Sequence, residues 1–249
     1  MNCPKCNFQQ PDQSTECLRC GIIFEKFRKH QTTVPQPPPV PGEPAAEADG
    51  VRSIAKNLLF YVNPEVNPLI FGGRVLFFLV ILIWGLKFIF TPMESGYVFK
   101  SFWHLVNLPF HEAGHIIFRP LGRFMTSLGG SLTQILMPLV CLGVFLIKTR
   151  DTFAASFSLW WVGENFMDLA PYIDDARRRT LPLLGGNTGR TSPYGFHDWD
   201  FILNEAGLIR YDHTLANLAF AIGCLLMICA FFWGGYVLLK QYRLLKTKD

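Results

Sequence analysis

Charged residues are scarce in this 249-residue chain: Lys, Arg, Asp and Glu together make up 17% of it, whereas half of the residues are hydrophobic. This composition excludes an ordinary soluble domain. Several apolar stretches approach the roughly 20 residues needed to cross a bilayer, which predicts an integral membrane protein. The net charge is only +4, and the basic residues flank the apolar stretches instead of alternating with aromatic residues. This pattern indicates membrane orientation, and we expect no nucleic-acid partner.

The chain also lacks the basic segment, short apolar segment and cleavage site of a secretory signal peptide. We therefore expect that the N-terminus is not exported and that its thiols stay reduced. Four of the seven cysteines lie in the first 20 residues, where they are free to bind a metal. The other three, Cys141, Cys224 and Cys229, lie in apolar stretches and are expected to be small buried hydrophobic residues.

Residues 1–30 are predicted to form a zinc ribbon. Two Cys-x-x-Cys pairs separated by ten residues can present four thiolates to one Zn²⁺ ion, and so small a unit has no core without the metal. Four cysteines leave no open coordination position, so this zinc is expected to be structural, and the ribbon offers a surface to a protein partner. The alternatives are a redox dithiol or a pair of disulfides. The expected ligands are Cys3, Cys6, Cys17 and Cys20.

Two segments connect the ribbon to the apolar part of the chain. Residues 31–50 are rich in proline and have almost nothing to bury, which predicts an extended, semi-rigid linker. Residues 51–73 are predicted to be an interfacial segment, with a short amphipathic helix on the membrane surface that Pro64 and Pro68 interrupt.

The remaining residues, 74–249, are predicted to form the membrane domain. The fold class is therefore all-α, with about five transmembrane helices and a small N-terminal zinc ribbon. A loop of about 40 residues precedes the last span, and loops of that length are usually functional or disordered. The expected spans are residues 74–91, 98–118, 128–147, 152–173 and 214–239.

Basic residues near the first spans, such as Lys56 and Arg74, predict a cytoplasmic N-terminus in a prokaryotic inner membrane. The second span would then end inside, at Arg119, and the fourth also, at Arg177. One feature disagrees, because five crossings place the basic residues after Lys240 outside. Either one of the five stretches is re-entrant or the rule fails at the end of the chain.

The functional prediction rests on residues 111–115, which read His-Glu-Ala-Gly-His. Residues four apart share a helix face, so His111 and His115 can bind one zinc ion, while Glu112 can take a proton from the water on it. Zinc lowers the pKa of that water and makes hydroxide available to attack a polarised carbonyl. Three ionisable residues in one turn of a span favour a functional site. The alternative is that residues 98–118 lie at the surface.

With this motif the chain resembles the site-2 protease class of intramembrane zinc metalloproteases, which take a third ligand, an aspartate, from a later element. Residues 168–176 resemble the proline-containing stretch that ends in Leu-Asp-Gly in that class, although the stretch is one residue shorter and has alanine in place of glycine. By this match Asp175 is the third ligand, with Asp174 beside it. Shorter relatives place the ligand in a loop before the last span, where Asp198 stands. One of Asp175 and Asp198 is therefore expected to bind zinc.

Each of these carboxylates can also be explained by a structural role. Asp198 can cap a helix over residues 199–207, and Asp174 and Asp175 can be a solvated pair beside three arginines. Two amides, Gln134 and Asn165, are expected to hydrogen-bond a substrate backbone, or alternatively to join helices.

The resemblance implies a zinc metalloendopeptidase, with Glu112 as general base, that hydrolyses peptide bonds of a membrane-associated peptide or protein. It implies one catalytic Zn²⁺, in addition to the structural Zn²⁺ expected in the ribbon. With the orientation inferred from the basic residues, the zinc motif and residues 168–175 both lie at cytoplasmic ends of their spans. One alternative is a non-catalytic, membrane-embedded metal-binding or regulatory protein with a cytosolic zinc ribbon. Another is zinc-dependent hydrolysis of a substrate other than a peptide.

Overall fold

The computed structural model describes residues 1–6, 8–12, 14–26, 46–184, 186–191 and 196–247. The chain divides into two compact units, Met1–Gly50 and Val51–Asp249. Most of the predicted linker, residues 31–50, lies outside the described residues. The described part is mostly helical, and its only β-structure consists of isolated bridges. This confirms the predicted helical class.

In the first unit the two Cys-x-x-Cys pairs sit on equivalent turns. The backbone N–H of Cys3 donates to the carbonyl of Phe8, and that of Cys17 donates to the carbonyl of Ile22, each at 2.9 Å. Phe24 packs against Cys3 and Cys17, and these three residues are the buried core of the unit. So small a core agrees with a unit that depends on a bound metal for its stability.

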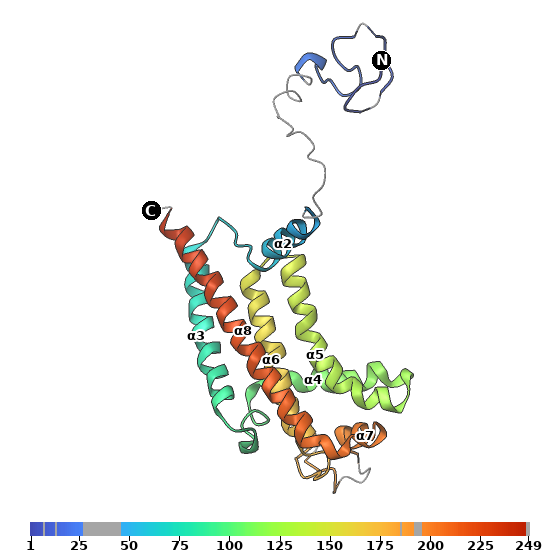
Figure 1. Cartoon of the computed structure of the whole chain (residues 1–249), viewed down its shortest axis with the longest axis vertical. Coiled ribbons are helices and arrows are strands. Elements are labelled where there is room, and N and C mark those ends of the chain that lie inside the picture. Colours follow the sequence, from blue (N-terminus) through green and yellow to red (C-terminus); the bar gives the residue numbers. More distant parts are fainter. Residues whose placement is uncertain (7, 13, 27–45, 185, 192–195, 248–249) are drawn as a thin grey trace. The chain divides into compact units, whose positions relative to one another are not determined.

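The second unit consists of long helices and short connections (Figure 1). Among the residues that the structure describes, three helical stretches are long and apolar enough to cross a membrane, namely Pro68–Phe90, Arg123–Ile147 and Ile209–Lys246. They indicate a membrane protein, and the predicted count of five spans is not confirmed. The helices are α2 (Ala46–Leu59), α3 (Pro68–Phe90), α4 (Phe102–Phe118), α5 (Arg123–Ile147), α6 (Thr152–Asp174), α7 (Asp198–Glu205) and α8 (Asp212–Lys246).

Helix α3 begins six residues earlier than predicted. The side chain of Asn67 accepts hydrogen bonds from the backbone N–H groups of Leu69 and Ile70, and Pro68 occupies the first helical position. Proline is favoured there because its missing N–H would have no partner in the helix. Pro68 therefore starts a helix instead of interrupting one, and the predicted interfacial segment 51–73 ends inside α3.

Helix α6 is the most buried helix of the unit, and its bounds match the predicted span 152–173. It packs mainly against α8. At their crossing a Cβ on Gly163 would lie 2.8 Å from the carbonyl oxygen of Gly223, so a side chain there would separate the helices. The polar residues Glu164 and Asp168 lower the apolarity of α6, but both are buried among protein neighbours.

Helix α4, predicted as the second span, has 17 residues and is not among the stretches that could cross a membrane. It forms a hairpin with the beginning of α5, and this hairpin projects sideways from the other helices (Figure 1). The two helices touch at glycines: a Cβ on Gly114 would lie 2.1 Å from the carbonyl oxygen of Gly129. Small residues thus bring the backbones of α4 and α5 together.

One end of the helices is held by residues 59–61, and we call it the N-terminal face. Trp233 donates to the carbonyl of Leu59, Lys240 to that of Phe60 and Thr152 to that of Tyr61, at 2.7 to 2.8 Å. The start of α6 and the end of α8 therefore lie together at this face.

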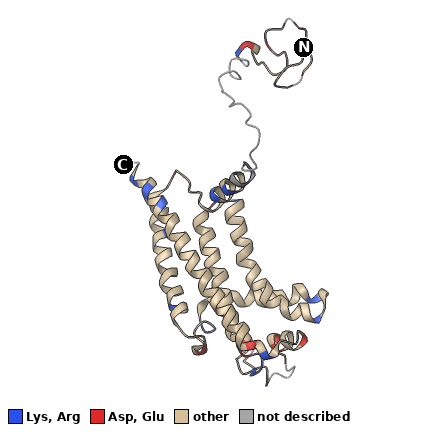
Figure 2. Ribbon diagram, viewed as in Figure 1, with Lys and Arg blue, Asp and Glu red and all other residues tan. Residues whose placement is uncertain are grey.

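The opposite end, which we call the loop face, holds the end of α6, the start of α8 and the described residues between them, namely 175–184, 186–191 and 196–211. There the guanidinium of Arg177 donates to both oxygens of the fully buried Asp212, at 2.7 and 2.6 Å. In Figure 2, acidic segments cluster around α7 at this face, whereas the end of α8 at the N-terminal face is basic.

This arrangement corrects the predicted placement of the basic residues. Arg177 lies at the loop face, opposite the N-terminal face where Arg74 pairs with Asp151. The two were expected on the same side of the membrane. Lys240, whose side was left open between a re-entrant stretch and a failure of the rule, lies at the N-terminal face. The physical reason is that α4 turns back in a hairpin, so an even number of long helices connects the two faces.

Candidate metal centre

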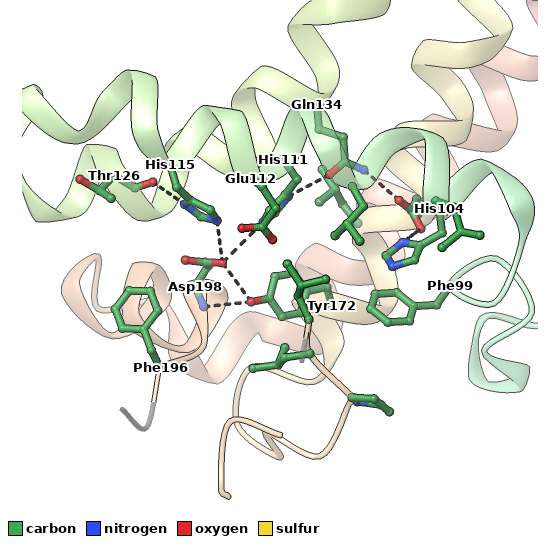
Figure 3. A pocket seen from close by; sticks show the side chains of 17 residues that line it. Phe99, His104, His111, Glu112, His115, Thr126, Gln134, Tyr172, Phe196 and Asp198 are labelled. Atoms are coloured by element: carbon green, nitrogen blue, oxygen red, sulfur yellow. Dashed lines mark hydrogen bonds and ion pairs between the residues drawn. The ribbon is translucent and has the colours of Figure 1, made fainter. Parts of the chain in front are cut away.

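The structure brings His111 and His115 of α4 together with Asp198 of α7 (Figure 3). One ligand atom from each lies within 4.8 Å of the others. Asp198 Oδ2 is 3.6 Å from His111 Nε2 and 3.4 Å from His115 Nε2. Tetrahedral zinc with bonds of about 2.0–2.1 Å sets its ligand atoms about 3.3–3.4 Å apart. The spacing of the three groups therefore suits one small metal ion.

The space between the imidazoles depends on a glycine of α5. A Cβ on Gly130 would lie 2.7 Å from His111 Nε2 and 2.7 Å from His115 Nε2. Any side chain at position 130 would occupy the volume into which the two nitrogens point. Gly114 allows α4 to approach α5 closely enough for this contact.

A chain of hydrogen bonds orients His111. Gln134 Nε2 donates to Asp168 Oδ2 at 2.9 Å, so Gln134 Oε1 faces His111 Nδ1, at 3.0 Å. An amide oxygen can only accept, and Nδ1 must therefore carry the proton. This leaves the lone pair of Nε2 directed toward Asp198, which is the arrangement that metal-binding histidines need.

His115 is oriented in the same way by the backbone. Its Nδ1 lies 2.8 Å from the carbonyl oxygen of Thr126, which can only accept a hydrogen bond. Nε2 of His115 is therefore also free to bind a metal.

Asp168 is itself held by three side chains. His104 Nδ1 lies 2.9 Å from Oδ1, while Asn107 Nδ2 and Gln134 Nε2 donate to Oδ2 at 3.1 and 2.9 Å. These partners come from α4 and α5, so Asp168 ties both helices of the hairpin to α6. The orientation of His111 thus depends on all three helices.

Asp198 is the first residue of α7, and its carboxylate faces the imidazoles. Tyr172 donates to Asp198 Oδ2 at 3.0 Å, while Oδ1 is buried without a hydrogen-bond partner among the described residues. Burial raises the pKa of this carboxyl, but the adjacent imidazoles, which can hold a proton between Nε2 and Oδ2 when no metal is bound, outweigh burial and keep the pKa well below its usual range. A metal ion would take the place of that proton, and Asp198 also offers it an oxygen without a hydrogen-bond partner among the described residues.

The reading of Asp198 as a helix cap is wrong. The cap of α7 is His197, whose Nδ1 accepts from the backbone N–H of Asp200 at 3.2 Å. This leaves the Asp198 side chain free to turn toward α4.

Asp175, the other expected ligand, is not brought to the imidazoles. It is 1% exposed and accepts hydrogen bonds from Thr180 Oγ1 and from the backbone N–H of Leu181, both at 2.8 Å. Its Oδ2 lies 3.5 Å from His197 Nε2. Burial raises the pKa of Asp175, but the nearby His197 and the hydrogen bonds from Leu181 and Thr180 lower it to about 2. Asp175 therefore anchors the loop that leads to α7, and it is not a solvated residue.

The metal-ligand group lines a cavity of about 760 Å³ together with Glu112, which lies beside His111 (Figure 3). Much of the remaining wall is apolar and includes Leu105, Leu108 and Leu169. The cavity thus presents a candidate metal position and the carboxylates of Glu112 and Asp168 to a mainly apolar space.

The two amides expected to bind substrate have different positions. Gln134 lines the cavity, but both ends of its amide are engaged by His111 and Asp168. Asn165 is fully buried, donates to the carbonyl of Trp161 within α6, and is not among the residues that line the cavity. Gln134 therefore orients a candidate ligand, and Asn165 has no contact with this space.

Several residues of the centre were missed by sequence reasoning. Asp168 and Tyr172 lie in the stretch 168–176, which was singled out only for its last aspartates, and Gly130 and His104 were not singled out. A signal was present for His104, since residues 104, 107, 111 and 115 are three or four apart and hence share one face of α4. No comparable signal marks the carbonyl of Thr126.

Comparisons with models of known families, with characterised proteins and with solved structures found no match for this chain. What the centre does must therefore be argued from its own geometry.

Proposed function

We propose that this protein is a zinc-dependent hydrolase of the membrane that cleaves peptide bonds of a membrane-associated peptide or protein, similar to the site-2 protease class. His111, His115 and Asp198 would hold the catalytic zinc. The observation that supports this most is the orientation of both Nε2 atoms toward Asp198, 3.6 and 3.4 Å away, in a cavity that Glu112 also lines.

A zinc ion at this position would polarise a carbonyl group and make water nucleophilic at neutral pH. Glu112 is the carboxylate placed to accept the proton of the attacking water and to give a proton to the leaving amine as the C–N bond breaks. Tyr172 holds Asp198 by a hydrogen bond of 3.0 Å.

The four cysteines of the first unit suit a second, structural zinc ion. Their sulfur atoms all lie within 4.8 Å of one another, with Cys3 and Cys20 at 3.7 Å and Cys6 and Cys17 at 3.6 Å. Tetrahedral Zn–S bonds of about 2.3 Å would set sulfur atoms about 3.8 Å apart. The set is complete without water, so we assign it a structural role and a surface for a protein partner.

We infer further that the N-terminal face is cytoplasmic and that the membrane is a prokaryotic inner membrane. Arg52, Lys56 and Arg74 precede or begin the first long apolar helix, and basic residues near the first span usually decide orientation. A ribbon with free thiols also belongs on a reducing side. Helix α6 then crosses together with α3, α5 and α8.

The test is Glu112→Gln in purified protein reconstituted with a single-span fluorogenic reporter. We expect the variant to keep its metal and to lose turnover by at least about 100-fold, the range in which general bases contribute. Glu94→Gln, at an exposed glutamate of the same unit, is the matched control and should retain activity. Full turnover by Glu112→Gln would exclude Glu112 as the base. Metal without turnover in the wild-type protein would favour a non-catalytic metal-binding or regulatory protein.

A further inference from the structure

The depth of the metal centre can be measured along α6, which runs from one face of the second unit to the other. Thr152, at its start, donates to Tyr61 at the N-terminal face, whereas Tyr172 donates to Asp198 in the centre. These residues are 20 positions apart, which is about 30 Å at 1.5 Å per residue. The hydrocarbon core of a bilayer is also about 30 Å thick. The centre thus lies a full hydrocarbon thickness away from the N-terminal face.

A layer of charged residues marks the boundary on the other side. Asp174 pairs with Arg178 and with His213, and Arg177 pairs with Asp212. Charged groups of this kind are costly within the hydrocarbon and are expected at its border. Because Tyr172 is only two residues from Asp174, the metal centre lies less than one helical turn from this layer.

The walls of the cavity indicate the same depth for the metal centre. One wall is helical, with Leu105 and Leu108 of α4, while the other includes residues 182–184 of the long loop. In the described part of this loop the β-structure is one antiparallel bridge, between Pro182 and Thr188, and Leu184 is 66% exposed. Irregular backbone is not found exposed to lipid within the hydrocarbon. The loop wall therefore lies in the interfacial region or in water.

From these three observations we propose that the metal centre works at the membrane interface of the loop face, and that its substrate is an extended, apolar juxtamembrane segment of a membrane-anchored polypeptide. Such a segment offers carbonyl groups that are not bonded within a helix, whereas those of a transmembrane helix are all bonded internally. With the N-terminal face in the cytoplasm, this interface is extracytoplasmic. The substrate class rests on the proposed hydrolase function, but the position of the centre does not.

Position is tested by labelling single cysteines with a membrane-impermeant maleimide in right-side-out vesicles. The parent protein carries Cys141→Ala, Cys224→Ala and Cys229→Ala, and its residual labelling at the ribbon is subtracted. Leu184→Cys tests whether the cavity wall is accessible to the maleimide. Ile54→Cys in α2 tests the N-terminal side, and Ile83→Cys tests a lipid-facing position in α3. All three residues are about two-thirds exposed.

We expect Leu184→Cys to react in intact vesicles, Ile54→Cys only after permeabilisation, and Ile83→Cys in neither state. If Leu184→Cys stays unlabelled even after permeabilisation, the centre lies within the bilayer and the proposal fails. Labelling of Leu184→Cys only after permeabilisation overturns the extracytoplasmic assignment. Neither measurement depends on turnover, so these failures differ from a failure of the hydrolase proposal.

The substrate class is tested with two single-span reporters that carry the same apolar ten-residue segment, on the extracytoplasmic side in one and on the cytoplasmic side in the other. Mass spectrometry of the products should place the cut in the extracytoplasmic segment, with at least tenfold less product from the other reporter. A cut near the middle of the span would overturn the juxtamembrane assignment even though it would support hydrolysis. Absence of any product from either reporter would count against both the substrate class and the proposed function, whatever the labelling shows.

Discussion

Asp168 Oδ2 accepts a hydrogen bond from Gln134 Nε2 at 2.9 Å, and this single contact decides which end of the Gln134 amide faces His111. Replacing Gln134 by leucine removes the acceptor for His111 Nδ1 and leaves Asp168 with one donor fewer. Loss of such an outer partner usually lowers metal affinity 10- to 100-fold. We therefore expect Gln134→Leu to lose zinc from the membrane site at a correspondingly lower chelator concentration, as measured by competition with a metal-binding dye.

Met137→Leu is the matched control for this change, since Met137 lies on the same helix and is 36% exposed. The ribbon zinc serves as an internal standard in both variants. An unchanged affinity of the membrane site in Gln134→Leu would mean that Gln134 does not orient His111.

The contact between Gly130 and the imidazoles leads to a second prediction. A methyl group at position 130 would lie 2.7 Å from both Nε2 atoms, so Gly130→Ala should exclude the metal from the centre and abolish turnover. Gly143→Ala, in the same helix, meets no atom within 4 Å and should leave metal and activity intact. Metal analysis of the two purified proteins compares them directly. Two bound ions in Gly130→Ala would contradict the position assigned to the metal.

The helices were easier to predict than their arrangement. The bounds of α6 agree with the prediction because Asp151 accepts hydrogen bonds from the N–H groups of Phe153 and Ala154 and so fixes the start. Helix α4 was taken for a span because its apolar content is high, yet its polar residues face α5 and α6. Hydropathy measures how apolar a helix is, whereas the direction in which the helix runs through the fold depends on its contacts with distant residues.

The metal centre, too, could be predicted only in part. His111 and His115 are four residues apart, so their shared face follows from helix geometry alone. Asp198 is 83 residues beyond His115, and its position depends on Tyr172 and on the loop that Asp175 anchors. Local sequence patterns contain no information on such a contact. For this reason Asp175 and Asp198 could not be ranked before the structure was known.

Metal stoichiometry provides a third prediction. Wild-type protein should contain two zinc ions, one per unit. Cys17→Ser removes one of four thiolates whose sulfur atoms lie within 4.8 Å of one another, and it should leave one ion, while His111→Ala should also leave one. Loss of both ions in either variant would show that the two sites are not independent. Inductively coupled plasma mass spectrometry of the purified proteins gives the count, and Cys229→Ser, at an exposed helical position, should keep both ions.

The lowered pKa of Asp175 predicts how the stability of the second unit depends on pH. Its value of about 2 lies below the ordinary 3.8, because the nearby His197 and the hydrogen bonds from Leu181 and Thr180 outweigh the effect of burial. A carboxyl whose pKa is lower in the folded state stabilises the fold above its unfolded pKa, and this contribution disappears as the pH falls toward the folded pKa. Asp175→Asn should therefore lower the free energy of unfolding by about 2 kcal/mol at pH 7.

The difference between wild type and Asp175→Asn should shrink as the pH falls from about 4 to about 2. Thermal unfolding in detergent, followed at several pH values, measures it. Because Asp175 also anchors the loop that positions Asp198, both proteins are measured after their metal has been removed with a chelator, so that metal binding does not contribute to the difference. Glu205→Gln, at an exposed residue at the end of α7, is the control and should show little difference at any pH. A difference for Asp175→Asn that stays constant from pH 7 to pH 2 would mean that its effect comes from packing and not from the charge of the carboxylate.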